Sequence, residues 1–89
     1  MTRIEHEATR IHIAAPDGPA AFALERRLSH LRPVTIGVEG DWTVELVDDD
    51  ERLEEIEAAV RHWLTERGLG ATTITVDGLP HPITAGEVR

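Results

Sequence analysis

The stretch that decides the fold reads Val34-Thr35-Ile36-Gly37-Val38, then Glu39-Gly40-Asp41, then Trp42-Thr43-Val44-Glu45-Leu46-Val47. Apolar and polar residues alternate on both sides of a short polar break, which is typical of a β-hairpin with one buried face. Because directly opposed residues in a hairpin share a face, Val38 should oppose Trp42 across the three-residue loop 39–41. A two-residue loop would instead oppose Val38 to Asp41 and place a carboxylate on the core side. The residues expected to face the core are Val34, Ile36, Val38, Trp42, Val44 and Leu46.

Two further segments show the alternation of half-buried strands. Residues 8–14 set Ile11 and Ile13 on one face and polar residues on the other. Residues 71–77 repeat this pattern around Ile74. Both segments are therefore predicted to be strands with one face in the core. The inward set is Thr9, Ile11, Ile13, Thr72, Ile74 and Val76, and the outward set is Arg10, His12, Thr73 and Thr75.

Two segments have helical periodicity instead. Asp17 is a suitable N-cap, and proline at position 19 is tolerated in a first turn, so a helix is predicted to start there and to end before Pro33. A second helix is expected at about residues 50–67, with Gly68 placed to terminate it. The apolar stripes are Ala21, Leu24, Leu28 and Leu31 in the first helix, and Leu53, Ile56, Val60, Trp63 and Leu64 in the second.

The resulting order is strand, helix, strand, strand, helix, strand. This order resembles the split βαβ arrangement called ferredoxin-like. It predicts an α+β two-layer sandwich, in which a four-stranded antiparallel sheet carries two helices on one face and its first and third strands are central. The expected organisation is a flexible N-terminus over residues 1–7, a domain over residues 8–77 and an extended C-terminal tail over residues 78–89.

This architecture hosts many functions, so the residues must decide among them. Metal chaperones of this fold use a Cys-x-x-Cys motif, and this chain has no cysteine. RNA-binding members present aromatic residues on the central strands, where this chain has Arg10, His12, Thr43, Glu45 and Val47. The net charge of −8 also argues against nucleic-acid and anionic-membrane partners. With no signal-like or membrane-spanning stretch, a cytoplasmic location is expected.

The face of the sheet away from the helices holds the strongest site candidates. Arg10 and His12 lie on a strand expected to neighbour the one that carries Thr43 and Glu45, so an Arg–Glu or His–Glu pair is predicted there. A solvated face with complementary charges explains this set, and a protein or dimer interface or a catalytic set are the alternatives. The full outward set is Arg10, His12, Thr35, Gly37, Thr43, Glu45, Val47, Thr73 and Thr75.

The charged and imidazole side chains give no sign of a metal or cofactor. The acidic run between Asp48 and Glu57 lies at the start of the second helix, where carboxylates cap the helix and complement its dipole. Its spacing does not fit a calcium loop. No pair of the five histidines has the spacing of two ligands on one helical face. We therefore expect neither a metal nor a cofactor.

The tail and one tryptophan are the remaining candidates. The stretch Leu79-Pro80-His81-Pro82-Ile83 should be extended, because each proline restricts its own backbone and that of the residue before it. It is either a frayed terminus or a segment that Leu79 and Ile83 anchor to another chain or to the edge of its own sheet. Trp42 is expected in the core, whereas a partly exposed Trp42 would favour an interface near the hairpin tip.

Two functions follow as hypotheses. The first is a small non-catalytic interaction or accessory module, with a protein partner or self-association through the open sheet, an edge strand or the tail. It rests on the absence from the sequence of a nucleophile–base set, a metal cluster and a phosphate loop, and on the poorly protected edge of the second strand. The alternative is a small-molecule-binding regulatory domain or small enzyme, with Arg10, His12 and Glu45 lining a cleft formed when the sheets of two copies pack together.

Overall fold

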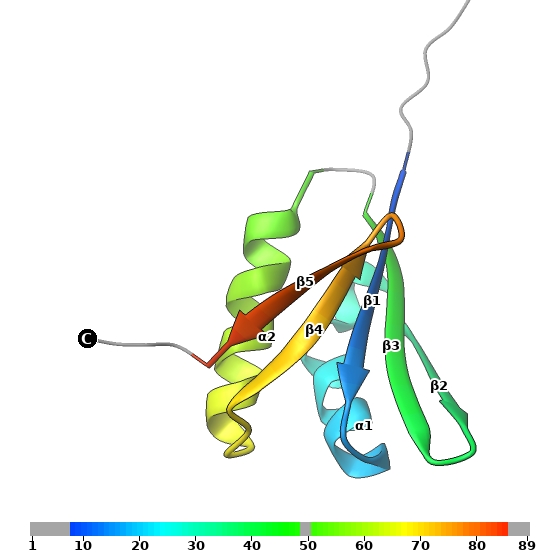
Figure 1. The fold of residues 1–89 in the computed structure, drawn as a ribbon. Helices are drawn as coiled ribbons and strands as arrows, with labels where there is room; N and C mark the ends of the chain where they lie inside the picture. Colours follow the sequence, from blue (N-terminus) through cyan, green and yellow to red (C-terminus); the bar gives the residue numbers. More distant parts are fainter. Residues whose placement is uncertain (1–7, 49–50, 86–89) are drawn as a thin grey trace, which may run out of the picture.

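The computed structural model describes residues 8–48 and 51–85 (Figure 1). The segment predicted as a flexible N-terminus, two aspartates of the acidic run and the last four tail residues lie outside the described residues. The elements are β1 (Thr9–Ala15), α1 (Gly18–Arg27), the 3₁₀ turn η1 (Ser29–Leu31), β2 (Val34–Val38), β3 (Asp41–Asp48), α2 (Leu53–Glu66), β4 (Ala71–Val76) and β5 (Leu79–Thr84).

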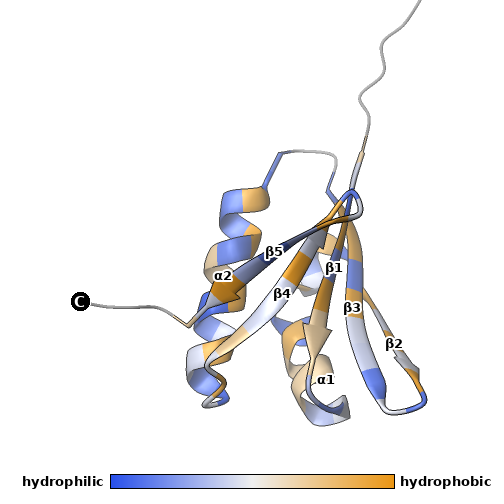
Figure 2. Ribbon diagram, in the orientation of Figure 1, coloured by the Kyte–Doolittle hydropathy of each residue, from blue (hydrophilic) through white to orange (hydrophobic). Residues whose placement is uncertain are grey.

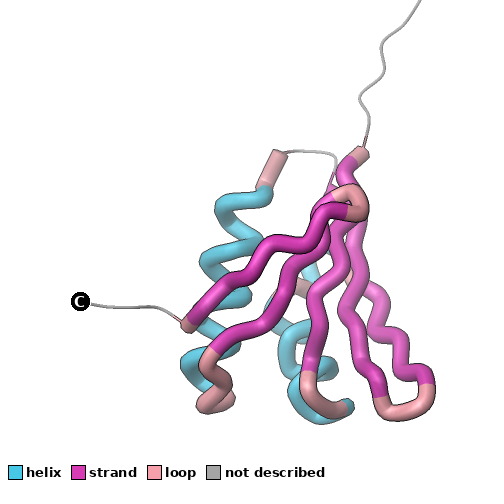
Figure 3. The backbone as a smooth tube through the Cα atoms, in the orientation of Figure 1, coloured by secondary structure: helices cyan, strands magenta, loops and turns pink. Residues whose placement is uncertain are grey.

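The strands form one sheet in the order β2-β3-β1-β4-β5, with every neighbouring pair antiparallel. The α+β class is confirmed, and β1 and β3 have strands on both sides. The predicted count of four strands is wrong, because residues 79–84 of the expected tail form a fifth strand beside β4 (Figure 3). Asp77 and Gly78 join the two strands with φ values of 52° and 84°, the positive values that a tight type I′ turn requires.

The predicted register of the β2–β3 hairpin is also wrong. Val38 pairs with Asp41 and Gly37 pairs with Trp42, so the loop is the two residues Glu39 and Gly40, both with positive φ. This register turns Val34, Ile36 and Val38 away from the helices. Their side chains are 57%, 37% and 58% exposed. Asp41 is exposed as well, so the two-residue loop places no carboxylate in the core.

The residues on the helix side of β2, Thr35 and Gly37, explain this register. Thr35 faces α1, where its hydroxyl donates a hydrogen bond of 2.6 Å to a carboxylate oxygen of Glu25. Gly37 lies beneath the indole of Trp42 and leaves room for that ring. A large aromatic side chain that covers a glycine on an edge strand is a known means of fixing register. Thr35 and Gly37, predicted to face outward, therefore face the helices.

Both helices pack on the same face of the sheet (Figure 1). Figure 2 shows hydrophobic residues recurring along the central strands and along both helices, between hydrophilic ones. The indole N–H of the buried Trp63 donates a 2.8 Å hydrogen bond to the carbonyl of Ala20, which ties α2 to α1. The buried apolar core is Ile11, Ile13, Ala20, Ala21, Leu24, Leu28, Val44, Leu46, Ile56, Val60, Trp63, Leu64, Ile74 and Ile83.

Local interactions define where the helices begin and end. The Asp17 carboxylate accepts a 2.8 Å hydrogen bond from the backbone N–H of Ala20, as predicted for an N-cap. Buried Asp48 accepts one of 2.8 Å from the backbone N–H of Arg52 at the start of α2. At the end of α2, Gly68 has a φ of 71°, and the N–H of Leu69 reaches the carbonyl of Leu64. This is the Schellman arrangement, so the predicted stop at Gly68 is confirmed.

Candidate binding cleft

The open face of the sheet, on the side away from the helices, carries the predicted outward residues except Thr35 and Gly37, which face the helices. The β1–β3 register opposes Arg10 to Val47, His12 to Glu45 and Ala14 to Thr43. Directly opposed residues share a face, so these side chains all lie on the open side. Thr73 and Thr75 follow on β4, with Thr75 opposite His12.

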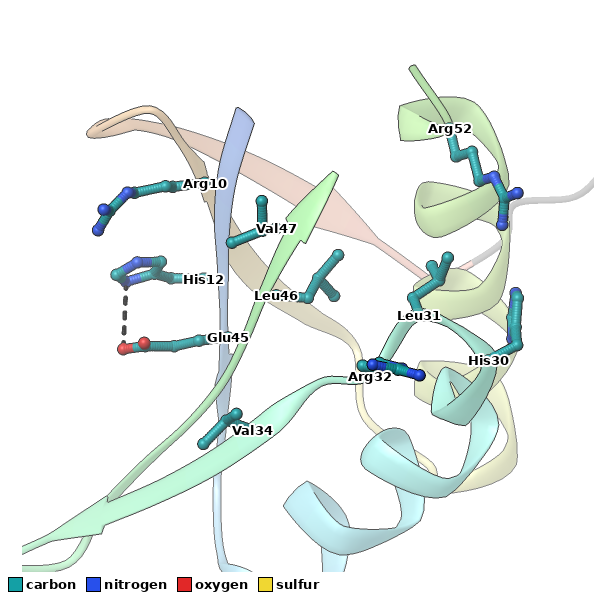
Figure 4. A pocket seen from close by; sticks show the side chains of 10 residues that line it. All are labelled: Arg10, His12, His30, Leu31, Arg32, Val34, Glu45, Leu46, Val47 and Arg52. Carbon is teal, nitrogen blue, oxygen red and sulfur yellow. Dashed lines mark ion pairs between the residues drawn. The ribbon is translucent and has the colours of Figure 1, made fainter. Parts of the chain in front are cut away.

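The predicted His–Glu pair is present. His12 Nδ1 lies 3.7 Å from Glu45 Oε2, with both side chains partly exposed (Figure 4). At that separation, in contact with water, such a pair is worth about 0.2–1 kcal/mol when the imidazole is protonated. It orients two polar groups on the sheet and adds little to stability.

A cleft of about 530 Å³ begins at this pair. It lies where β3 runs past the start of β2: pairing between the two strands stops at Val34 and Glu45, whereas β3 continues to Asp48. The loop after α1 and the start of α2 complete the walls. The lining residues are Arg10, His12, His30, Leu31, Arg32, Val34, Glu45, Leu46, Val47 and Arg52.

The cleft has two sides, which β3 separates (Figure 4). Arg10, His12 and Glu45 project on one side of the strand, and Leu31, His30 and Arg52 lie on the other. His30 is engaged there by Glu55, with Nε2 2.9 Å from Oε2. On that second side Arg32 lies with Leu31 and Leu46, a combination suited to an anionic group attached to an apolar body.

The side chains of the cleft are charged, imidazole and aliphatic groups. Its lining has no hydroxyl or thiol side chain, so it offers no serine, threonine or cysteine nucleophile. Elsewhere in residues 8–48 and 51–85, no three His, Cys, Asp or Glu side chains gather in a way that could hold a metal ion.

Neither α1 nor α2 has the length and the apolar content that a bilayer-crossing helix requires.

The predicted site residues fall into three places. Arg10, His12 and Glu45 line the cleft, and Thr43 lies beyond it on the same face. Trp42 is half-buried on the helix side, where its ring meets Phe22 edge-on with centroids 5.7 Å apart.

The two tail candidates are separated from that site. Both lie on β5, where Leu79 is 64% exposed and Ile83 is 5% exposed within the core of its own chain. Of the anchoring modes that the sequence left open, Ile83 therefore follows the one in which the segment joins the edge of its own sheet.

Sequence reasoning missed the other half of the cleft: His30, Arg32 and Arg52. These residues come from the loop after α1 and from the start of α2, and no local motif connects the two segments. Only the topology shows that they lie together, because the chain leaves α1 and enters α2 at the same end of the sheet (Figure 1).

Comparisons with protein-family models, curated proteins and solved structures gave no match to this chain.

Proposed function

We propose that this chain is a small non-catalytic interaction or accessory module, built on a ferredoxin-like fold with an added edge strand, that acts through protein–protein contacts. The observation that carries the proposal is the exposed apolar row of β2: Val34, Ile36 and Val38. Val47, 55% exposed on the same face, extends this row toward the cleft. A row of exposed apolar residues bordered by polar ones is typical of a binding surface.

The polar residues beside the row support contact rather than catalysis. His12 and Glu45 lie 3.7 Å apart and are both partly exposed, as is usual for polar residues at the rim of a contact surface. Arg10, on the same face, supplies charge for orienting a partner. Such residues at the rim of an interface chiefly affect specificity and association rate.

A photo-crosslinking amino acid at position 36 tests the proposal in cells that produce the protein. The matched control places the same amino acid at His62, which is exposed on α2. Adducts of discrete protein mass from position 36, and none from position 62, are the expected result. Failure to form adducts at position 36, or identical adducts from both positions, would contradict an interaction surface on β2.

The alternative function is a small-molecule-binding regulatory domain or small enzyme that uses the cleft. Arg32 beside Leu31 and Leu46, on the helix side of β3, is the observation that favours it. Thermal melting in the presence of fatty carboxylates and organic phosphates tests this reading. An increase in melting temperature that Arg32→Ala abolishes, and that Arg26→Ala on the exposed surface of α1 does not, would support it. No increase with any compound would count against it.

A further inference from the structure

The two edges of the sheet differ in what they offer another strand. In an antiparallel sheet, alternate residues of an edge strand direct their backbone N–H and C=O groups outward, where no strand pairs with them. β5 forms one edge and β2 forms the other. Which residues face outward follows from the two tight turns.

The β5 edge is blocked. A two-residue turn is closed by a hydrogen-bonded pair, here Val76 and Leu79, so Leu79 and every second residue after it direct their backbone toward β4. The intervening residues, Pro80, Pro82 and Thr84, take the outward positions. Proline has no N–H group, so two of the three outward positions of β5 lack the donor that an added strand would need, and only Thr84 at its end keeps one.

The β2 edge has no such block. Its turn is closed by Val38 and Asp41, which directs the backbone of Val34, Ile36 and Val38 toward β3. Thr35 and Gly37 therefore present their N–H and C=O groups to the outside. The hydrogen bonds between Arg10 and Asp77 lead to the same assignment. They show that the backbone of Arg10 faces β4, and the alternation of facing residues, followed through β1 and β3, again leaves Thr35 and Gly37 facing outward.

We propose that β2 pairs antiparallel with β2 of a second copy of this chain, about a twofold axis at Ile36. Thr35 and Gly37 of the two copies then exchange four backbone hydrogen bonds, and the two sheets become one. On the open face, Ile36 lies beside its own copy and Val34 lies beside Val38 of the other chain. The exposed apolar row thereby finds an apolar partner along its whole length.

The charges at the ends of β2 favour this partner. Arg32 precedes the strand and Glu39 follows it, and both are exposed. Antiparallel pairing about Ile36 places Pro33 opposite Glu39 of the other copy, so Arg32 comes next to that carboxylate at both ends of the joined strands. The same strand in parallel alignment would bring like charges together. Two ion pairs therefore select the antiparallel alignment, against the general repulsion of two chains of charge −8.

This dimer rests on the proposed function and deepens it by naming the partner. The first test is the mass of the protein in solution, measured by light scattering. The purified chain should have twice the monomer mass of 9.9 kDa at micromolar concentration. Ile36→Lys sets two like charges together at the twofold axis and should weaken dimerisation roughly tenfold or more. Thr73→Lys is the matched control: it places the same charge at an exposed position of the open face on β4, away from the β2 edge, and should leave the dimer intact.

A charge exchange tests the alignment itself. Arg32→Glu and Glu39→Arg should each weaken the dimer, by roughly two- to thirtyfold for the loss of two exposed ion pairs. The double variant restores opposite charges across the axis and should recover most of the lost affinity. A merely structural role for either residue would make the double variant at least as weak as the single ones.

A monomer at all concentrations would overturn self-pairing, as would a dimer that Ile36→Lys leaves unchanged. Circular dichroism on each variant separates loss of the dimer from loss of the fold. A monomer that still gives crosslinks from position 36 to a different protein would overturn the second copy as the partner and retain the proposed function.

Discussion

The indole ring of Trp42 lies against Gly37, its partner across the hairpin, so closely that a Cβ atom on residue 37 would sit 2.7 Å from it. The same ring lies 3.1 Å from the Cβ position of Gly18 at the start of α1. The ring of Phe22 packs edge-on against the same indole. Two glycines thus allow one tryptophan to fasten the tip of the hairpin to the first helix.

Replacing Gly37 should therefore be costly. Gly37→Ala should lower the free energy of unfolding by about 1–3 kcal/mol, because the methyl group forces the ring or the strand to move. Gly70→Ala is the control, since its Cβ position meets no atom within 4 Å and its φ is not left-handed. Urea unfolding measures both. Equal effects at the two positions would show that Trp42 moves aside without strain.

The hydrogen bond between the helices gives a second prediction. Trp63→Phe removes the donor and leaves the carbonyl of Ala20 buried without it, so a loss of about 1–3 kcal/mol in unfolding free energy is expected. Trp42→Phe makes the same change at a half-buried ring and should have a smaller effect. The remaining tryptophan in each variant reports unfolding by fluorescence. An equal loss in both would assign the effect of Trp63 to ring volume.

Glu66 predicts a pH dependence. Its hydrogen bond with the Arg27 guanidinium, helped by the charges of Arg27 and His62, holds the pKa of this carboxyl below its usual 4.5, although desolvation acts in the opposite direction. A pKa that is lower in the folded state than in the unfolded state contributes stability above pH 4.5, and this contribution disappears as the pH falls through the folded value.

Glu66→Gln should therefore be less stable than the parent chain at neutral pH, with the difference vanishing in acid. Urea unfolding over a series of pH values measures it, and the difference is small because the pair is at the surface. In an Arg27→Gln background, most of this pH-dependent effect should be lost, because only the charge of His62 then lowers the pKa of Glu66. Persistence of the effect there would assign it to another neighbour of Glu66.

The prolines of β5 give a fourth prediction. Replacing Pro80 and Pro82 with threonine supplies outward N–H groups and should make the chain associate beyond the dimer as its concentration rises. His81→Thr is the control, because its backbone faces β4. Light scattering across a concentration series distinguishes the two. An unchanged mass in the double variant would show that the edge is protected by something other than its missing donors.

Much of the fold could be predicted from periodicity, because strands and helices bury their apolar residues at different intervals. In β1, β3 and β4, the residues that alternation predicts to face inward do face the helices, because each of these strands has the core on one side and solvent on the other. The face of β2 could not be obtained in this way. Its alternation identified two faces, and the assumption that the apolar one is buried chose the wrong face.

The fifth strand and half of the cleft were missed for other reasons. Prolines at alternate positions disfavour a central strand, yet an edge strand accepts them where the N–H would face outward, as Pro80 and Pro82 do. The cleft residues Arg32 and Arg52 are brought together by the end of one helix and the start of another. Their approach depends on three-dimensional packing, to which local sequence gives no signal.

The position of β1 has a consequence for how the chain folds. Both of its neighbours, β3 and β4, are synthesised after it. The second edge of β1 is therefore covered only when β4 pairs with it, as in the contact between Ile13 and Ile74. Such long-range pairing slows folding, because the intervening chain must lose its freedom before the contact forms. A nascent chain therefore carries β1 with one of its edges uncovered until β4 has been made.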